Sequence, residues 1–436
     1  MRIDHPTHPP VRLRGRGVLA AFLGTALLAA GMTGTAAAAH PAADPSVITD
    51  WNATAVQTIV VDAAINNATT FHWFALEQAA VYNAVEGITG KYELYRWHAH
   101  ASRGASPEAA AAAAAHRILS NYFPASQVNL DAAYATSLLK IADGKGKDRG
   151  IAFGERAAAR IIKLRLNDGW NAPIAFTEPP APGVWRPTLP AFAPMLAPWL
   201  GDVRPLLLRT AHQYSPPGPP AMTSNQYTRE FNEVKDLGSL NSLSRTPLQT
   251  ETAKFISAIP IAPLQASFRD LVTRHHLDIS KSARLFAAVD MSIADAIGVV
   301  WYSKLHFAFW RPITAIQLAD TDGNPATVAD PTWVPLIATP PYPEYGSGFN
   351  SVVGSATRAL TRVLGTSRID LYISSPATMT TRHYEWASQL TSDGVNGRIW
   401  SGLHFRAADE DSLVMARKVA GFALDHYFQP RHDPSH

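Results

Sequence analysis

The stretch SKSARLFAAVDMSIADAIGVVWYSKLHFAFWRP, residues 280–312, decides the fold class. Its apolar residues recur at helical spacing as far as residue 310. Because proline disfavours α geometry in the residue before it, Pro312 predicts that the helix ends at Arg311. We expect Asp295 to form an ordinary ion pair on this helix or to orient a nearby cation.

Helical spacing continues on both sides of this stretch. The Ala-rich run after Ser106 and the pair Thr246 and Pro247 have the residue types of helix caps and first turns. We expect two helices within 46–88 and others over 107–119, 129–141, 150–167, 226–237, 247–259, 264–276, 349–364, 379–393 and 409–427. Alternating strand patterns are scarce, so the sequence predicts an all-α fold, a large helical bundle.

Prolines are so frequent between residues 169 and 220 that regular helix is excluded there. We expect a long loop that wraps the surface. It would separate an N-terminal helical region, 40–225, from a C-terminal helical region, 226–436. With 436 residues, 47% of them hydrophobic and 17% charged, the chain can bury a large core.

The segment 1–39 has the three parts of a secretory signal peptide. Arginines between residues 12 and 16 precede an apolar run over 18–30, and small residues follow as far as Ala39. We expect cleavage near Ala39 and export by the general secretory route, because an Arg-Arg pair is absent. No second uninterrupted apolar span of membrane length follows, so we expect a secreted protein that is free of the membrane after cleavage.

Charge and cysteine content narrow the functional classes. The segment 1–39 holds four of the 38 basic residues and one of the 35 acidic residues, which leaves 34 of each sign in the rest of the chain. No cluster of Lys and Arg is interleaved with aromatic residues, so a nucleic-acid partner is not expected. The chain has no cysteine, which excludes thiol catalysis and thiolate metal sites.

Two elements of the C-terminal region combine cations with a helix start. Lys304 and Arg311 are seven residues apart, about two helical turns, so their side chains would point to nearly the same side. In PPYPEYGSG, residues 340–348, Ser347 has the position of an N-cap, and the N–H of Gly348 could face an anion. Taken singly, such a cation pair is usually a solvated helix face, and such a Ser-Gly is usually only a cap.

The third element is GRIWSGLHFR, residues 397–406. Gly402 lies between Arg398 and His404, so we expect a turn that brings both side chains together. A lone histidine is usually a core or surface residue. Together, however, a Lys, two Arg, a capped helix start and a His supply the donors that an oxyanion needs and one neutral nitrogen for covalent chemistry.

In this order the three elements resemble the signature shared by vanadium-dependent haloperoxidases and type 2 phosphatidic acid phosphatases: K-x6-R-P, P-S-G-H and S-R-x5-H. The residues around them look like the bacterial haloperoxidase branch. The resemblance implies a helical bundle whose site lies between helix ends. It implies that the oxygens of vanadate or phosphate are held by Lys304, Arg311, Ser347, Gly348, Arg398 and His404. It also implies that Lys304 and His404 are catalytic, and that His404 bonds to vanadium or attacks phosphorus.

The sequence departs from this signature at three positions. Phe349 stands where the family has its acid–base histidine, Gly346 replaces the proline, and Gly397 replaces the serine. General acid–base catalysis typically contributes about 10²- to 10⁴-fold, so the family's activity should be weak here unless a neighbour substitutes. The candidates for that neighbour are His306, Tyr342, His383 and Asn350.

Three functional hypotheses follow. The first is a haloperoxidase that uses vanadate and hydrogen peroxide to oxidise halide, with an organic acceptor. The second is a phosphomonoesterase in which His404 forms a phosphohistidine. The third, motivated by Phe349, is a degenerate relative that holds vanadate or phosphate without turnover, or a scaffold reused for a metal-free rearrangement.

Overall fold

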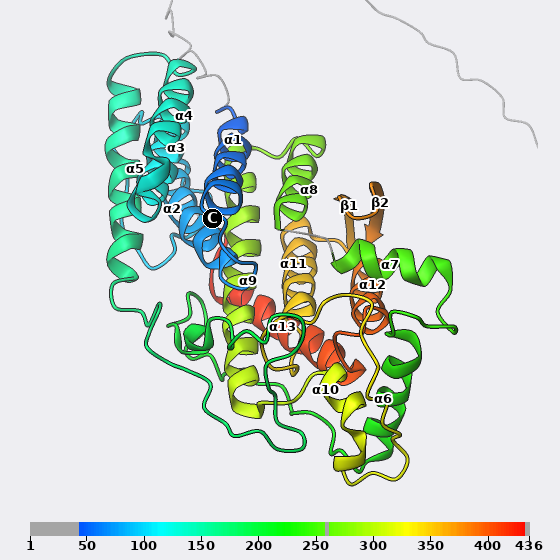
Figure 1. Cartoon of the computed structure of the whole chain (residues 1–436). Helices are drawn as coiled ribbons and strands as arrows, with labels where there is room; N and C mark the ends of the chain where they lie inside the picture. Colours follow the sequence, from blue (N-terminus) through cyan, green and yellow to red (C-terminus); the bar gives the residue numbers. More distant parts are fainter. Residues whose placement is uncertain (1–42, 258–260, 432–436) are drawn as a thin grey trace, which may run out of the picture. The chain divides into compact units, whose positions relative to one another are not determined.

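One long helix, α9 (Ile279–Phe307), is the core helix of the fold (Figure 1). The computed structural model that shows it describes residues 43–257 and 261–431, so the expected signal peptide lies outside the described residues. Asp278 caps the start of α9, because its carboxylate accepts a 2.9 Å hydrogen bond from the N–H of Lys281. By length and composition α9 could cross a membrane, but 83% of its most apolar window is buried inside the protein. Its hydrophobicity therefore serves the core.

The other helices follow the predicted order. In the described residues they are α1 (Ser46–Ala55), α2 (Thr70–Thr89), α3 (Pro107–Tyr122), α4 (Gln127–Leu139), α5 (Lys145–Leu164), α6 (Asn225–Leu237), α7 (Pro247–Ser257), α8 (Ile261–Arg274), α10 (Pro312–Gln317), α11 (Gly348–Leu364), α12 (Ala387–Trp400) and α13 (Arg406–His426). Short turns of other helix types are η1 (Val56–Asp62), η2 (Pro124–Ser126), η3 (Pro198–Asp202) and η4 (Ala319–Thr321). Helices α2, α11 and α13 pack on α9. The all-α prediction is confirmed.

Small residues set the packing of α3 against α5. The predicted cap of α3 is confirmed, because Ser106 Oγ accepts a hydrogen bond from the N–H of Ala109 at 3.1 Å. All seven alanines of 109–115 are buried. A Cβ on Gly154 of α5 would lie 2.2 Å from the carbonyl oxygen of Ala110, so only glycine lets the two backbones approach this closely.

The only sheet in the described residues is a hairpin, which corrects the prediction of a helix over 379–393. Strands β1 (Arg368–Ser375) and β2 (Thr380–Trp386) pair antiparallel, with Leu371 opposite Tyr384. Along β1 every second residue is buried, which is the two-residue period of a strand with one face on the core. The helix begins only at Ala387, where α12 starts.

The proline-rich stretch forms a loop without α-helix, as predicted, and a buried carboxylate holds it on α9. Asp295 accepts hydrogen bonds from the N–H groups of Leu206, Leu207 and Leu208 at 2.7–2.8 Å. Both expected roles of Asp295, a helix ion pair and a partner of a site cation, are therefore wrong. Its three acceptor contacts fix the loop against the core helix instead.

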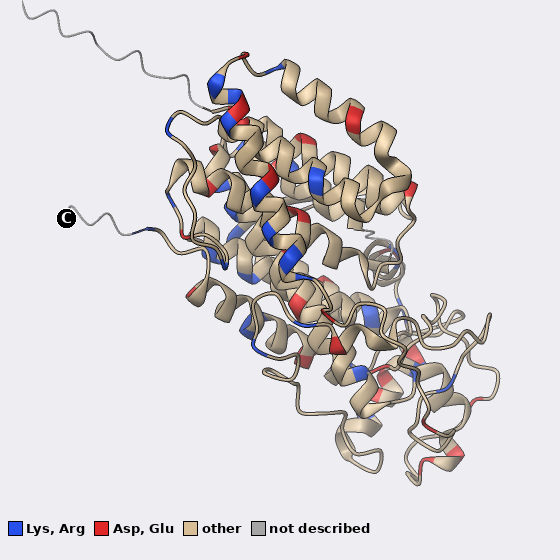
Figure 2. Cartoon of the chain, turned by 90° about the vertical axis from the view of Figure 1, so that its left-hand side faces the viewer, with Lys and Arg blue, Asp and Glu red and all other residues tan. Residues whose placement is uncertain are grey.

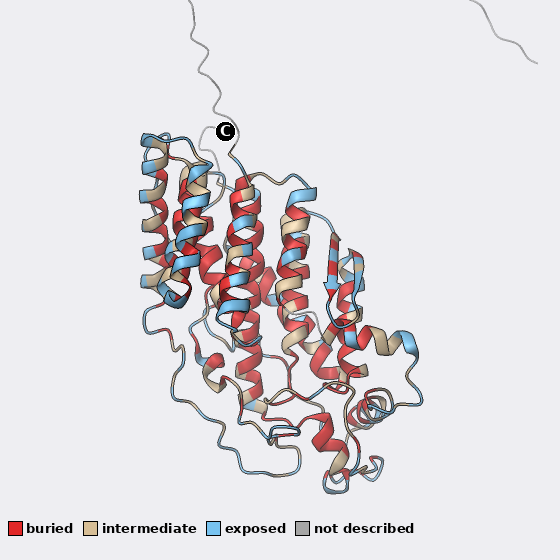
Figure 3. Ribbon diagram, turned by 45° about the horizontal axis from the view of Figure 1, so that its top comes forward, coloured by how far each residue is buried: buried red, intermediate tan, exposed pale blue. Residues whose placement is uncertain are grey.

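Buried and exposed faces separate cleanly along the helices. Figure 3 shows the buried sides of the helices turned inward and the exposed sides outward. Figure 2 shows acidic and basic residues interspersed on the face that it presents. The chain from Ala43 onward is one compact unit, in which α2 packs on α9. A boundary near residue 225 stays a prediction.

Candidate oxyanion site

Five helix ends and turns bring the predicted side chains together. The site lies at the end of α9, the starts of α10 and α11, the last turn of α12, and the turn between α12 and α13. Each predicted side chain that projects into it is at least 92% buried: Lys304, Arg311, Ser347, Arg398 and His404. The convergence inferred from three separate sequence elements is thus present in the fold.

The route from Lys304 to Arg311 differs from the prediction. Helix α9 ends at Phe307, and Ala308 is left-handed with φ 49°. The next residues leave the helix to pair with the proline-rich loop, where the N–H of Trp310 donates to the carbonyl of Gly183 at 2.9 Å. Arg311 is therefore not the last residue of a helix: it has extended geometry and precedes the first residue of α10. Because these residues pair with the proline-rich loop, the helix ends four residues earlier than Pro312 alone predicts.

Lys304 holds the loop that leads into α11. Its Nζ donates to the carbonyls of Pro343 at 2.7 Å, Glu344 at 3.0 Å and Gly346 at 2.5 Å. Burial and the nearby Arg311 lower the pKa of Lys304. Three acceptors nevertheless require three N–H donors, and only the ammonium form has them. Its direct contact with an anion stays a prediction.

Arg311 is fixed by the protein but keeps one free donor group. Its Nε donates to the carbonyl of Tyr342 at 2.8 Å, and its Nη1 donates to the carbonyl of Leu403 at 2.9 Å. Its Nη2 is buried without a partner among the described residues. An orphaned guanidinium nitrogen is costly to bury, so this donor calls for an acceptor such as an anion.

Arg398 has even fewer partners. Its guanidinium makes no hydrogen bond with any described residue, and its Nε is fully buried. Its Cζ lies 5.7 Å from the centroid of the Phe349 ring, within the range of a cation–π contact. The ring at the position of the family histidine thus stacks on a site cation.

The start of α11 has the predicted cap. Ser347 Oγ accepts a hydrogen bond from the N–H of Asn350 at 3.3 Å, and Gly348 is the first residue of the helix. The N–H of Ser347 itself is used, because it donates to Ser412 Oγ at 2.8 Å. With the N–H of Asn350 capped, the N–H groups of Gly348 and Phe349 have no partner inside the helix, so they remain suited to an anion.

Glu344 orients the histidine, and the sequence analysis did not single it out. Oε1 of Glu344 lies 3.0 Å from Nδ1 of His404, and Arg311 Nη1 lies 3.3 Å from Nε2. A guanidinium can only donate, so Nε2 must be the acceptor and Nδ1 carries the proton. Burial and the neighbouring cations lower the pKa of His404, which keeps the ring neutral. A lone pair on Nε2 therefore faces the cations.

A second carboxyl group, Asp409, was also missed. Its Oδ1 accepts a 2.7 Å hydrogen bond from Asn350 Nδ2, and its Oδ2 is buried without a partner in the described part of the chain. Burial raises the pKa of Asp409 to about 7, and burial raises the pKa of Glu344 to about 8. Glu344 lies inside the segment 340–348 and Asp409 lies three residues after the segment 397–406, so their closeness to these segments was the available signal.

The four candidates for the missing acid–base group separate into two pairs. His306 is exposed and stacks on Tyr302, and His383 is exposed on β2 and contacts Asp370. Neither is at the site. Tyr342 is, because its ring centroid lies 4.8 Å from Cζ of Arg311, as is Asn350, which contacts Asp409.

Two of the departures from the family signature have steric reasons. A Cβ on Gly397 would lie 2.9 Å from Cβ of Ile256, so the helix α7 side chain occupies the space that a serine would need. A Cβ on Gly346 would lie 2.5 Å from Ser412 Oγ, the atom that accepts from Ser347. The oxyanion site therefore has room only for glycine at both positions. Phe349 contacts Arg398 and packs against the hydrophobic core, and nothing in the structure requires a phenylalanine there.

The geometry favours a tetrahedral oxyanion. Lys304, Arg311 and Arg398 are buried cations, and two of them keep orphaned donors. In the described ranges no three His, Asp or Glu side chains are placed to hold a metal ion. Such an oxyanion would meet two guanidinium donors, a helix start and one neutral imidazole nitrogen.

Comparison with known proteins finds a family model, a sequence relative and solved structures. Residues 284–433 match the family model described as the VCPO second helical-bundle domain. A vanadium chloroperoxidase of Curvularia inaequalis is 27% identical over 281 residues, which are 48% of this chain and 46% of that protein. The chain thus spans about half the length of that relative.

Solved structures share the fold. A bacterial vanadium-dependent iodoperoxidase superposes with a TM-score of 0.76 at 22% identity, over 90% of this chain and 98% of that one. The holo form of a bacterial vanadium-dependent chloroperoxidase superposes with a TM-score of 0.68 at 14% identity, over 88% and 97%. At these identities the likeness establishes the architecture.

Proposed function

The chain belongs to the superfamily of vanadium-dependent haloperoxidases and type 2 phosphatidic acid phosphatases, and from this premise we propose that it is an exported enzyme that binds vanadate and oxidises halide with hydrogen peroxide. The orphaned donors of Arg311 and Arg398 carry the proposal, because only a bound acceptor would satisfy them. The composition of segment 1–39 supports export.

The residues present fit vanadate. Arg311 Nη2, Arg398 Nε and the N–H of Gly348 would hold its oxygens, and Nε2 of His404 would take the metal in place of its 3.3 Å contact with Arg311 Nη1. When bound, vanadate supplies the Lewis acid that activates peroxide toward halide. Glu344 keeps the proton of His404 on Nδ1, and Lys304 keeps the loop 343–346 in place. Phe349 cannot exchange a proton, so we expect slower turnover than in a relative with histidine there.

The test is vanadate dependence of halide oxidation. Protein freed of anions by dialysis against EDTA is loaded with orthovanadate, and bromination of a phenol dye is followed at fixed peroxide and bromide. We expect a rate that saturates with vanadate and falls when phosphate competes for the same cations. The same rate with and without vanadate would contradict the proposal.

A second function is favoured by one observation. The lone pair on Nε2 of His404, oriented by Glu344, is also what a phosphoryl acceptor needs. An aryl phosphate is the fair substrate, because its leaving group needs little protonation. Hydrolysis that is lost in His404→Ala, together with a lack of vanadate-dependent bromination, would assign the site to a phosphomonoesterase.

Anion affinity is expected to fall as the pH rises. Asp409, whose pKa burial raises to about 7, and Glu344, whose pKa burial raises to about 8, are neutral below these values. Between pH 6 and 8.5 both ionise beside the cations, and sulfate binding should weaken by about tenfold. Sulfate is the probe because it does not titrate in this range, and calorimetry gives its Kd.

The matched variant for this pH profile is Asp409→Asn. It keeps the shape of the side chain and cannot ionise. We expect its sulfate affinity to change less between pH 6 and 8.5 than that of the unmodified protein. Two profiles that coincide would show that Asp409 does not govern the charge at the site.

A further inference from the structure

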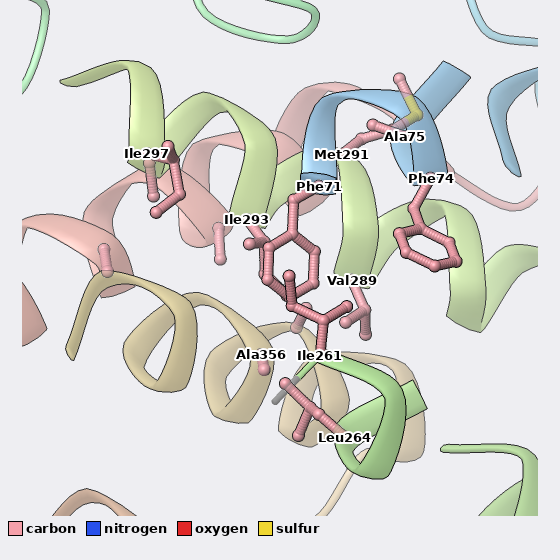
Figure 4. Close-up of a cluster of buried hydrophobic side chains, with 14 of the residues drawn as sticks. Phe71, Phe74, Ala75, Ile261, Leu264, Val289, Met291, Ile293, Ile297 and Ala356 are labelled. Carbon is pink, nitrogen blue, oxygen red and sulfur yellow. The ribbon is translucent and has the colours of Figure 1, made fainter. Parts of the chain in front are cut away.

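A cavity of about 140 Å³ lies directly beside the oxyanion site. Its walls come from helices α2, α8, α9, α11 and α12 and from strand β1. Figure 4 shows Phe71, Ile261, Leu264 and Ala356 of this wall grouped within the apolar cluster, with Ile297 farther along α9. Most of the lining is hydrocarbon, so water gains few hydrogen bonds there.

The polar residues Asn67, Ser257, Tyr342 and Arg398 interrupt the apolar lining, and part of the wall is shared with the oxyanion site. Arg398, Tyr342, Gly348 and Phe349 line both. The Arg398 guanidinium, which makes no hydrogen bond with a described residue, lies in this shared part of the wall, so its Nη groups could donate to a second ligand while Nε holds the oxyanion. Phe349 forms part of the boundary, so the residue that replaces the family's polar histidine extends the apolar wall as far as the cations.

The volume limits the occupant to about one ring. An engineered cavity of about 150 Å³ in another protein binds benzene, which sets the scale. The apolar wall disfavours charged groups, and Arg398 favours an oxygen substituent on the ring. A phenol has both features.

The geometry points to this cavity as the binding site for a single-ring phenol, held with its oxygen toward Arg398 and its ring against Phe349. The inference rests on the proposed function, since the phenol would be the organic acceptor of the oxidised halogen. In that step a ring carbon–halogen bond forms while the halogen–oxygen bond of hypohalous acid breaks. The proton leaves the ring, and with the released hydroxide it makes water.

The test is binding without peroxide or halide. Calorimetric titration with 4-methylphenol measures Kd, and quenching of tryptophan fluorescence gives a second readout because Trp301 lines the cavity. We expect saturable binding of 4-methylphenol and none of benzylamine, whose ammonium Arg398 would repel, or of 2-naphthol, which has two rings. Binding of all three alike, or of none, would overturn the inference.

Two variants on one helix locate the site. Val352 lines the cavity and Val363 does not, and both are partly buried on α11. Val352→Phe should fill the cavity and raise the Kd for 4-methylphenol by about tenfold or more. Val363→Phe should leave this Kd unchanged. Equal affinity in the two variants would place the phenol elsewhere and reject the cavity.

The same samples separate this inference from the proposed function. Their melting temperature is measured with and without orthovanadate. A vanadate shift without phenol binding would reject the cavity and retain the oxyanion site. Phenol binding without a vanadate shift would support the cavity and reject the haloperoxidase proposal.

Discussion

Phe349→His is expected to raise the rate of vanadate-dependent bromide oxidation by about 10²- to 10⁴-fold, the usual contribution of a general acid–base group. The side chain lies at the start of α11 and 5.7 Å from Cζ of Arg398, measured to its ring centroid. The helix start and the guanidinium would both lower the pKa of a histidine there. The ring would therefore be neutral near pH 7 and could accept a proton.

Phe349→Leu is the control for this gain. It removes the aromatic contact with Arg398 without adding a titratable group, so we expect no rise in kcat. An equal rise in both variants would mean that space, and not proton transfer, limits the reaction. A high bromination rate that histidine leaves unchanged would show that another group already acts, with Tyr342 and Asp409 as the candidates at the site.

Arg398→Met is expected to abolish most of the anion binding without harming the fold. The guanidinium makes no hydrogen bond with a described residue and is buried near the cations Lys304 and Arg311, so an apolar chain of similar length should raise or preserve the melting temperature of the anion-free protein. Loss of one such donor should reduce turnover by about 10²- to 10³-fold.

Thermal unfolding with orthovanadate measures the binding part of this prediction. A ligand at 100 times its Kd stabilises a protein by about 2.7 kcal/mol, and this shift should disappear in the variant. Arg245→Met is a control, since this arginine lies outside the oxyanion site and donates to the carbonyls of Ser239 and Trp400. We expect Arg245→Met to lower the melting temperature and to keep the vanadate shift. A full vanadate shift in Arg398→Met would remove Arg398 from the site.

Short-range patterns were enough to find the cations but not their environment. Ser347 was predicted as a cap and is one, and Gly402 was predicted to turn the chain between Arg398 and His404 and has φ +76° there. Both predictions depend on local backbone chemistry. Helices α11 and α13 were likewise predictable, because the apolar residues of each recur at helical spacing along one face.

The failures have a common physical cause in long-range pairing. Helix α9 ends early because residues 308–310 pair with the loop near Gly183, which is more than a hundred residues away. Strand β2 was mistaken for helix because its partner β1 determines its conformation. Glu344 shows its role only once His404 is placed 3.0 Å from it, since a single carboxylate after a proline has many possible uses.

The ammonium of Lys304 donates hydrogen bonds to the carbonyl oxygens of three residues of one loop, Pro343, Glu344 and Gly346. The oxyanion site is therefore formed before the anion binds, and anion binding should require little rearrangement of the protein. Loss of Lys304 would loosen the loop 343–346, whereas loss of Arg398 would remove a hydrogen-bond donor to the anion. Substitutions of Lys304 and of Arg398 would then both weaken anion binding, but for different reasons. The first would disorder the loop, and the second would remove an attractive charge.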